Sequence, residues 1–104
     1  MAKLPASFIQ RNHTYEVPRS GYYRTIPIEA VDGDTFKDKS RGTKGLLMIE
    51  PNSRVFLMIQ SFLDDGRIGV FVEKHDKFDR PMEPFGILIE RDNLMQLIEQ
   101  PDRY

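Results

Sequence analysis

The feature that most constrains the fold is a pair of alternating apolar segments around the turn sequence DDG at 64–66. Aliphatic residues occupy alternate positions from Val55 towards Leu63, and the pattern resumes over 68–73. A period of two is typical of a β-strand with one buried face. Glycine supplies the positive φ that a tight hairpin requires. The segments 54–63 and 68–73 are therefore predicted to form two antiparallel strands.

The first of these strands has two apolar faces. Alternation places Phe56, Met58, Gln60 and Phe62 opposite the aliphatic face that begins at Val55. Strands that are apolar on both faces are normally covered on both. We expect a helix over one face and a partner or ligand over the other.

Three further strands are predicted over 22–30, 46–50 and 85–90. Turn-forming residues separate these segments at short intervals, as in antiparallel β proteins. Pro27 lacks an amide donor, which favours an edge position for its strand. The predicted fold class is α+β, with a mainly antiparallel sheet of four to five strands.

The end of the chain carries one helical pattern. Leu94, Leu97 and Ile98 fall at i, i+3 and i+4, and Asp92 or Asn93 is suited to cap the helix. A helix of about nine residues is too short to be stable alone, so we expect it to pack on one face of the sheet. Residues 1–20 are poorly patterned and are predicted to form an extended arm. Residues 21–104 are predicted to form a single β-rich domain.

Composition excludes several classes of protein. The 104 residues contain no cysteine, which rules out disulfides, thiolate nucleophiles and zinc sites with cysteine ligands. The sequence has no apolar run long enough to span a membrane. We expect a cytoplasmic protein. The net charge is −1, but the stretch 37–44 holds four basic residues and one acidic residue, which suits either a solvated loop or a phosphate-binding loop.

Two groups of residues were considered for catalysis or metal binding. The string EAVDGDTF at 29–36 resembles the first hairpin of staphylococcal-type nucleases, and the resemblance implies a metal ligand at Asp34. Gly45 and Ser53 stand where that family has a phosphate-binding arginine and a carboxylate base, so we predict a turn and no enzymatic activity. We expect no cofactor. A weak divalent-metal site at Glu73, His75, Asp76 and Asp79 is left open.

The segment 54–100 is similar to the single-stranded-DNA-binding domain of the transcriptional positive-cofactor family. The strand of that family matches Gly86, Ile87 and Ile89. Its helix matches Asp92, Asn93, Leu94, Gln96, Leu97 and Glu99. The aromatic and basic residues of its hairpins match Phe62, Arg67 and Phe78. The helix tryptophan of the family is Leu94 here, and its usually basic hairpin is acidic at Asp64 and Asp65.

The resemblance implies a homodimer that holds a single strand against its sheets. Aromatic rings would stack on bases, and cations would follow the backbone. The dimer interface would involve Leu94, Leu97 and Ile98. The residues expected to bind nucleic acid are Lys37, Lys39, Arg41, Lys44, Arg54, Phe62, Arg67, Lys74, Lys77, Phe78 and Arg80.

Two functions are therefore predicted as alternatives. The first is single-stranded nucleic-acid binding in transcription or replication, with the choice between DNA and RNA open. Tyr22 and Tyr23 are additional candidates for stacking. The second is a small phage- or plasmid-type module that binds and modulates a host enzyme, such as a polymerase, without catalytic activity of its own. The neutral net charge and the two apolar strand faces favour this second function.

Overall fold

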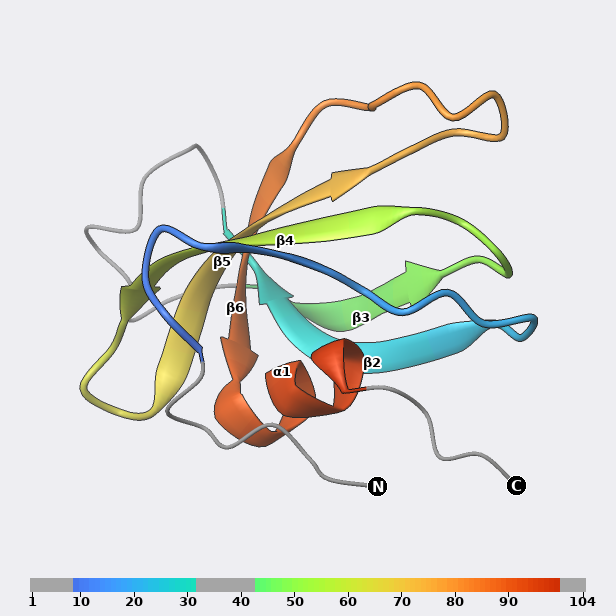
Figure 1. Cartoon of the computed structure of the whole chain (residues 1–104). Coiled ribbons are helices and arrows are strands. Elements are labelled where there is room, and N and C mark those ends of the chain that lie inside the picture. The colour runs from blue at the N-terminus through green and yellow to red at the C-terminus, as the bar shows by residue number, and fades with distance from the viewer. Residues whose placement is uncertain (1–8, 32–42, 100–104) are drawn as a thin grey trace.

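The computed structural model describes residues 9–31 and 43–99. These residues form a six-stranded antiparallel sheet and one short helix (Figure 1). The predicted fold class is confirmed, with more strands than expected. The elements are β1 Thr14–Glu16, β2 Arg24–Ala30, β3 Thr43–Ile49, β4 Val55–Phe62, β5 Arg67–Lys74, β6 Phe85–Glu90 and α1 Arg91–Ile98.

The sheet has the strand order β1-β4-β5-β6-β2-β3. Strands β4, β5 and β6 form a meander, and β2 and β3 form a hairpin that joins the meander through β6. The β4–β5 turn contains Gly66 at φ 93°, as the DDG sequence predicts. No helix among the described residues is long and apolar enough to cross a membrane.

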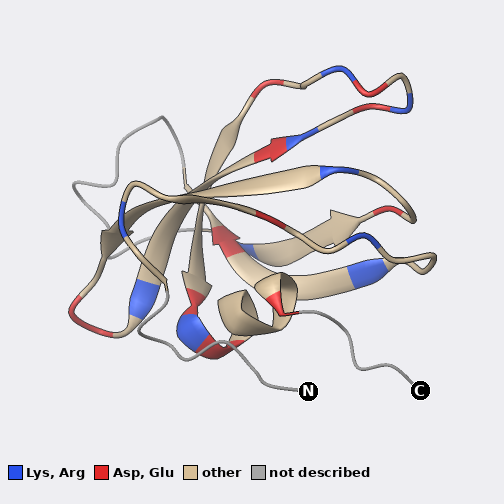
Figure 2. Cartoon of the chain, viewed as in Figure 1, with Lys and Arg blue, Asp and Glu red and all other residues tan. Residues whose placement is uncertain are grey.

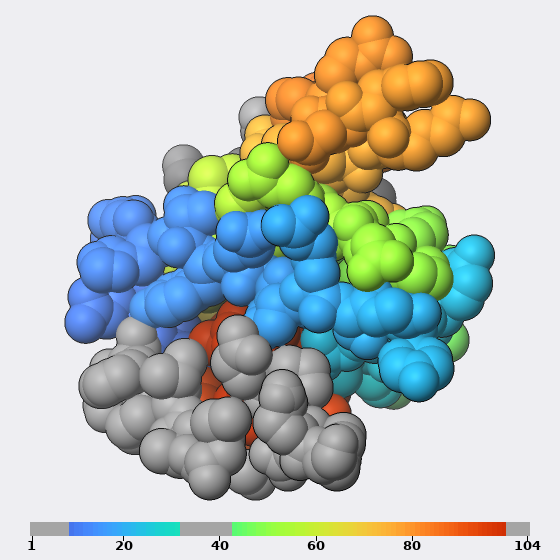
Figure 3. Space-filling view, turned by 45° about the vertical axis from the view of Figure 1, so that its right-hand side comes forward, coloured from blue at the N-terminus to red at the C-terminus, as the bar shows by residue number. Residues whose placement is uncertain are grey.

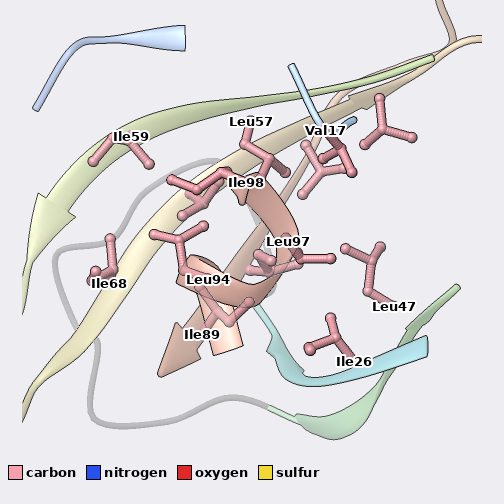
Figure 4. Packing of buried hydrophobic residues seen from close by; sticks show 14 of the residues in the cluster. Val17, Ile26, Leu47, Leu57, Ile59, Ile68, Ile89, Leu94, Leu97 and Ile98 are labelled. Atoms are coloured by element: carbon pink, nitrogen blue, oxygen red, sulfur yellow. The ribbon is translucent and has the colours of Figure 1, made fainter. Parts of the chain in front are cut away.

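The core lies between the curved sheet and α1 (Figure 4). Leu94 and Leu97 are fully buried and Ile98 nearly so, against aliphatic side chains from β2 to β6. The helix therefore packs on one face of the sheet, as the apolar spacing predicts. Because these three side chains lie in the core of their own chain, they offer no surface for the helix pairing that the family resemblance implied.

The sixth strand, β1, comes from the segment that was expected to be an arm. It pairs with β4, and Ile9 and Val17 on either side of it are buried in the core. Backbone hydrogen bonds from Asn12 N to Ile59 O (2.8 Å) and from Val17 N to Val55 O (2.9 Å) hold the segment in place. The described part of residues 1–20 thus completes both the sheet and the core.

Phe62 lies on the opposite face of the sheet from the one predicted, because β4 contains a bulge. The register of β4 against β5 shifts between Ile59 and Ser61, so Phe62 pairs with the fully buried Ile68. Opposite residues of an antiparallel pair share a face, so Phe62 lies on the helix side of the sheet. Arg91, the first residue of α1, lies over its ring at 5.7 Å.

Two local expectations also differ from the structure. The N-cap of α1 is Glu90, with no side-chain capping bond, because β6 runs directly into the helix. Asp92 instead occupies the first turn, where a carboxylate interacts favourably with the helix dipole. Pro27 lies in a strand with neighbours on both sides, yet β6 pairs only with Glu29 and Ala30 of that strand. The missing amide of Pro27 therefore interrupts no ladder.

Candidate functional site

Three segments meet at one end of the sheet: residues 17–23, the turn 50–54 between β3 and β4, and the loop 75–84 between β5 and β6 (Figure 1). The amide of Asn52 donates to Ser20 O at 2.7 Å and holds the first two segments together. The amide of His75 donates to Arg54 O at 3.0 Å and holds the turn against the loop. We call this region the loop end of the sheet.

The loop 75–84 is shaped by Asp76. One carboxylate oxygen, Oδ1, accepts hydrogen bonds from the amides of Phe78 (2.9 Å) and Arg80 (3.0 Å). The amide of Asp76 donates to Arg80 O at 2.9 Å, which closes the loop. These amide donors, that of Arg80 above all, lower the pKa of Asp76 from its ordinary value. The side chain of a single residue thus fixes the backbone on both sides of Phe78.

Asp79 forms a second anchor of the loop. Its backbone has φ 63°, a left-handed conformation that Asp tolerates better than most residues. His75 Nδ1 donates to its carboxylate at 3.0 Å, and Arg54 Nη1 donates at 3.2 Å. The hydrogen bond from His75 is the main cause of the lowered pKa of Asp79, and Arg54 adds to it. The loop is therefore tied to the start of β4.

Phe78 is presented at the tip of this loop. Its side chain is 64% exposed. Lys77 Nζ lies 5.4 Å and the Arg80 guanidinium 5.0 Å from the ring centroid, both within the range of cation–π interaction. An exposed ring held between two cations, on a loop whose backbone is fixed, can stack on another flat ring while the cations reach anionic groups beside it.

A pocket of about 750 Å³ adjoins this loop. It is lined by Arg19 from the first segment, Asn52 from the turn and Lys77 from the loop, together with Arg54 and Lys74. In the space-filling view the loop stands out from the body of the molecule (Figure 3). The exposed rings of Tyr22 (79%) and Tyr23 (66%) follow closely after Arg19 in the sequence.

Most cations of the loop end are paired with carboxylates. Lys74 Nζ lies 3.2 Å from Glu50 and also donates to Met48 O at 2.9 Å. Arg54 contacts Asp79 and lies 3.6 Å from Glu16. Basic and acidic residues alternate along the loop 75–84 (Figure 2). The four cationic and three acidic side chains that line the pocket leave one net positive charge, with His75 neutral.

The other two residues predicted from the hairpins lie at the opposite end of β5. Arg67, the first residue of β5, lies 2.8 Å from Glu29 and 2.7 Å from Asp65. The hydrogen bond between Arg67 and Asp65 lowers the pKa of Asp65 and raises that of Arg67. The length of β5 separates this end, which includes Phe62, from Lys74 by roughly 23 Å. The predicted residues therefore do not form one continuous site.

The remaining predicted residues fall elsewhere. Lys37, Lys39 and Arg41, with Asp34 of the nuclease-like string, lie outside the described residues. Lys44 is exposed on β3. His75 contacts Glu73 at 3.7 Å and Asp79 at 3.0 Å, but no group of three or more ligands suited to a metal ion is found within residues 9–31 and 43–99.

Sequence reasoning missed the part that Arg19 and Asn52 play at the loop end. Arg19 follows a proline in a segment without alternation, so no pattern placed it beside 50–54. Asn52 has φ 59°, and the Pro-Asn pair at 51–52 did signal its turn. Comparisons of the chain with protein-family models, curated proteins and solved structures found no match. The function is therefore argued from the chemistry of the loop end.

Proposed function

We propose that the protein binds single-stranded nucleic acid at the loop end of the sheet. The observation that carries the proposal is the ring of Phe78, which is largely exposed and held between Lys77 and Arg80. An exposed ring on a loop whose backbone is fixed by side-chain hydrogen bonds can receive a flat ligand at little cost in conformational entropy. Bases are flat ligands of matching shape, and their phosphates suit the flanking cations.

The surroundings of Phe78 extend this surface. Lys77 contacts the ring and also lines the pocket, and Arg19 provides a further cation on the pocket wall. Neither residue forms a salt bridge with another described residue. A strand whose base stacks on Phe78 would place its neighbouring phosphates beside these two cations. The proposed contact covers a few nucleotides and has no means of reading their sequence.

Replacement of Phe78 tests the proposal. Stacking on an aromatic ring contributes about 1–3 kcal/mol per base, so Phe78→Ala is expected to weaken oligonucleotide binding roughly 5- to 150-fold. The measurement is fluorescence anisotropy with a labelled oligothymidine at low salt. The matched control is Phe62→Ala. The Phe62 ring is also exposed and has one cation over it, but it lies near the far end of β5. Equal losses for both variants, or none for Phe78→Ala, would refute the assignment.

The salt dependence distinguishes the alternative function. Each phosphate contact on a single strand contributes about −0.7 to the slope of log K against log salt concentration. The ion pairs of Arg54 and Lys74 reduce the number of cations that are free to bind phosphate. We expect a shallow but negative slope, corresponding to two or three contacts. The absence of oligonucleotide binding would instead favour the protein-interaction module, since paired charges and exposed apolar side chains also suit a protein partner.

A further inference from the structure

The strand β3 is an edge of the sheet. It stands last in the strand order, and its only strand neighbour among the described residues is β2. Its backbone takes part in no backbone hydrogen bond of these residues beyond its own ladder. An edge strand with unpaired backbone groups is a template for another strand unless charge, proline or a covering segment blocks it.

Hydrogen bonding on the other side of β2 shows which groups of β3 face outwards. The amide of Val31 donates to Gly86 O at 3.1 Å, so Val31 directs its backbone towards β6. Directions alternate along a strand, so Pro27 also points towards β6 and exchanges no hydrogen bonds with its partner Leu46. The backbone groups of Leu46, and of the residues two positions before and after it, therefore point out of the sheet.

Lys74 provides independent support for this direction. Its Nζ reaches Met48 O at 2.9 Å from outside the β2–β3 ladder. The outward positions of β3 are thus Lys44, Leu46 and Met48. Their side chains share one face of the sheet. Glu50 follows β3 in the turn, where its carbonyl accepts hydrogen bonds from the amide (3.3 Å) and the hydroxyl (2.8 Å) of Ser53.

The row of outward residues is apolar in the middle and charged at its two ends. Leu46 is 65% and Met48 46% exposed, and both are flanked by the exposed Lys44 and Glu50. The charges at the two ends are opposite in sign. A second copy of the same row, turned by a two-fold axis through Leu47, places Lys44 opposite Glu50 and Leu46 opposite Met48. In this register, the outward backbone groups of Leu46 and Met48 meet each other, and Met48 O accepts a second hydrogen bond beside the one from Lys74.

We propose that β3 pairs antiparallel with β3 of a second copy of the chain. The pairing is isologous, so each contact occurs twice. It joins the two sheets into one, covers the exposed Leu46 and Met48, and adds two ion pairs between Lys44 and Glu50. A carboxylate has two oxygens, so Glu50 keeps its contact with Lys74. The interface meets the loop end at Glu50, which also lines the pocket there.

The first test is the oligomeric state of the full chain, measured by analytical ultracentrifugation over the concentrations used for NMR. The wild type is expected to form a dimer. The double variant Leu46→Lys, Met48→Lys is expected to remain a monomer, because lysines then face lysines across the axis. Met82→Lys is the matched control, since Met82 is also exposed (52%) and lies in the β5–β6 loop, outside the outward row of β3. A monomeric wild type, or a double variant that still dimerises, would overturn the proposal.

Charge exchange tests the register. Lys44→Glu alone is expected to raise the dimer dissociation constant about tenfold, because two attractive cross-strand pairs become repulsive. The combined variant Lys44→Glu with Glu50→Lys is expected to return it towards the wild-type value. Circular dichroism confirms that each variant is folded. An equal loss in the single and combined variants would contradict this register and the proposal with it.

Discussion

Asp76 is the residue on which the shape of the proposed site depends most. Its carboxylate accepts the amides on both sides of the Phe78–Asp79 segment. We expect Asp76→Ala to free these amides and to raise hydrogen exchange at Phe78 and Arg80 in NMR spectra. Asp76→Asn keeps an acceptor oxygen and is expected to retain most of the protection. Equal exchange in both variants would show that the side chain does not hold the loop.

The loop is also expected to respond to pH. The pKa values of Asp76 and Asp79 are both lowered from their ordinary value of 3.8. A carboxylate whose pKa is lower in the folded state stabilises that state above its ordinary pKa, and this contribution is lost as the pH falls through the lowered value. The protection factors of amides in residues 75–80, which correct for the pH dependence of intrinsic exchange, should therefore be constant from neutral pH to about pH 5 and fall below pH 4. A loss of protection that begins near neutral pH would contradict the assignment to these two carboxylates.

The sequence predicts individual residues of the candidate site better than it predicts which residues lie next to them. Phe78 matches an aromatic residue of the family that the segment 54–100 resembles. The approach of Arg19 and Asn52 depends on a tertiary hydrogen bond to Ser20, for which no local pattern exists. The ion pair of Lys74 with Glu50 joins β5 to the turn after β3, a strand that is not a neighbour of β5 in the sheet. Such contacts follow from topology, which a single sequence specifies weakly.

The helix α1 contributes to the fold through its buried face. Leu97 is almost fully buried among residues of the sheet (Figure 4). We expect Leu97→Ala to lower the free energy of unfolding by about 2–5 kcal/mol, because the substitution leaves a cavity. Gln96→Ala, on the exposed face of the same helix, is expected to stay within about 0.5 kcal/mol of the wild type. Urea unfolding measures both, and similar losses would show that the helix does not pack as described.

Element types were largely predictable, whereas their ends and faces were less so. Periods of two and of three to four residues identified five strands and the helix. The bulge after Ile59 moved Phe62 to the helix side, and strict alternation could not reveal it. The strand β1 has three residues and a partly exposed pattern, and it is held by pairing with β4. Its stability comes from tertiary contacts, so its own sequence carries little signal.

At the scale of the whole molecule, the sheet separates two ends with different character. One end carries the β4–β5 turn and Arg67, and we call it the hairpin end. Arg67 forms ion pairs there with Asp65 and Glu29, which neutralise its charge. The loop end exposes Phe78 and the pocket. The residues predicted from the sequence to bind nucleic acid come from both ends and were treated as one site. The pairing of β2 with β6, which determines the strand order, joins segments more than fifty residues apart and could not be read from local patterns.

The most direct test of the account is to map oligothymidine binding onto the amide resonances of the full chain by NMR. We expect chemical-shift changes in three segments of the loop end, residues 19–23, 51–54 and 74–82, with the largest at Phe78. Resonances of Phe62, Arg67 and Arg91 are expected to stay in place. Changes centred on the hairpin end, or a spectrum unaffected by a large excess of the oligonucleotide, would contradict the claim that the loop end binds single-stranded nucleic acid.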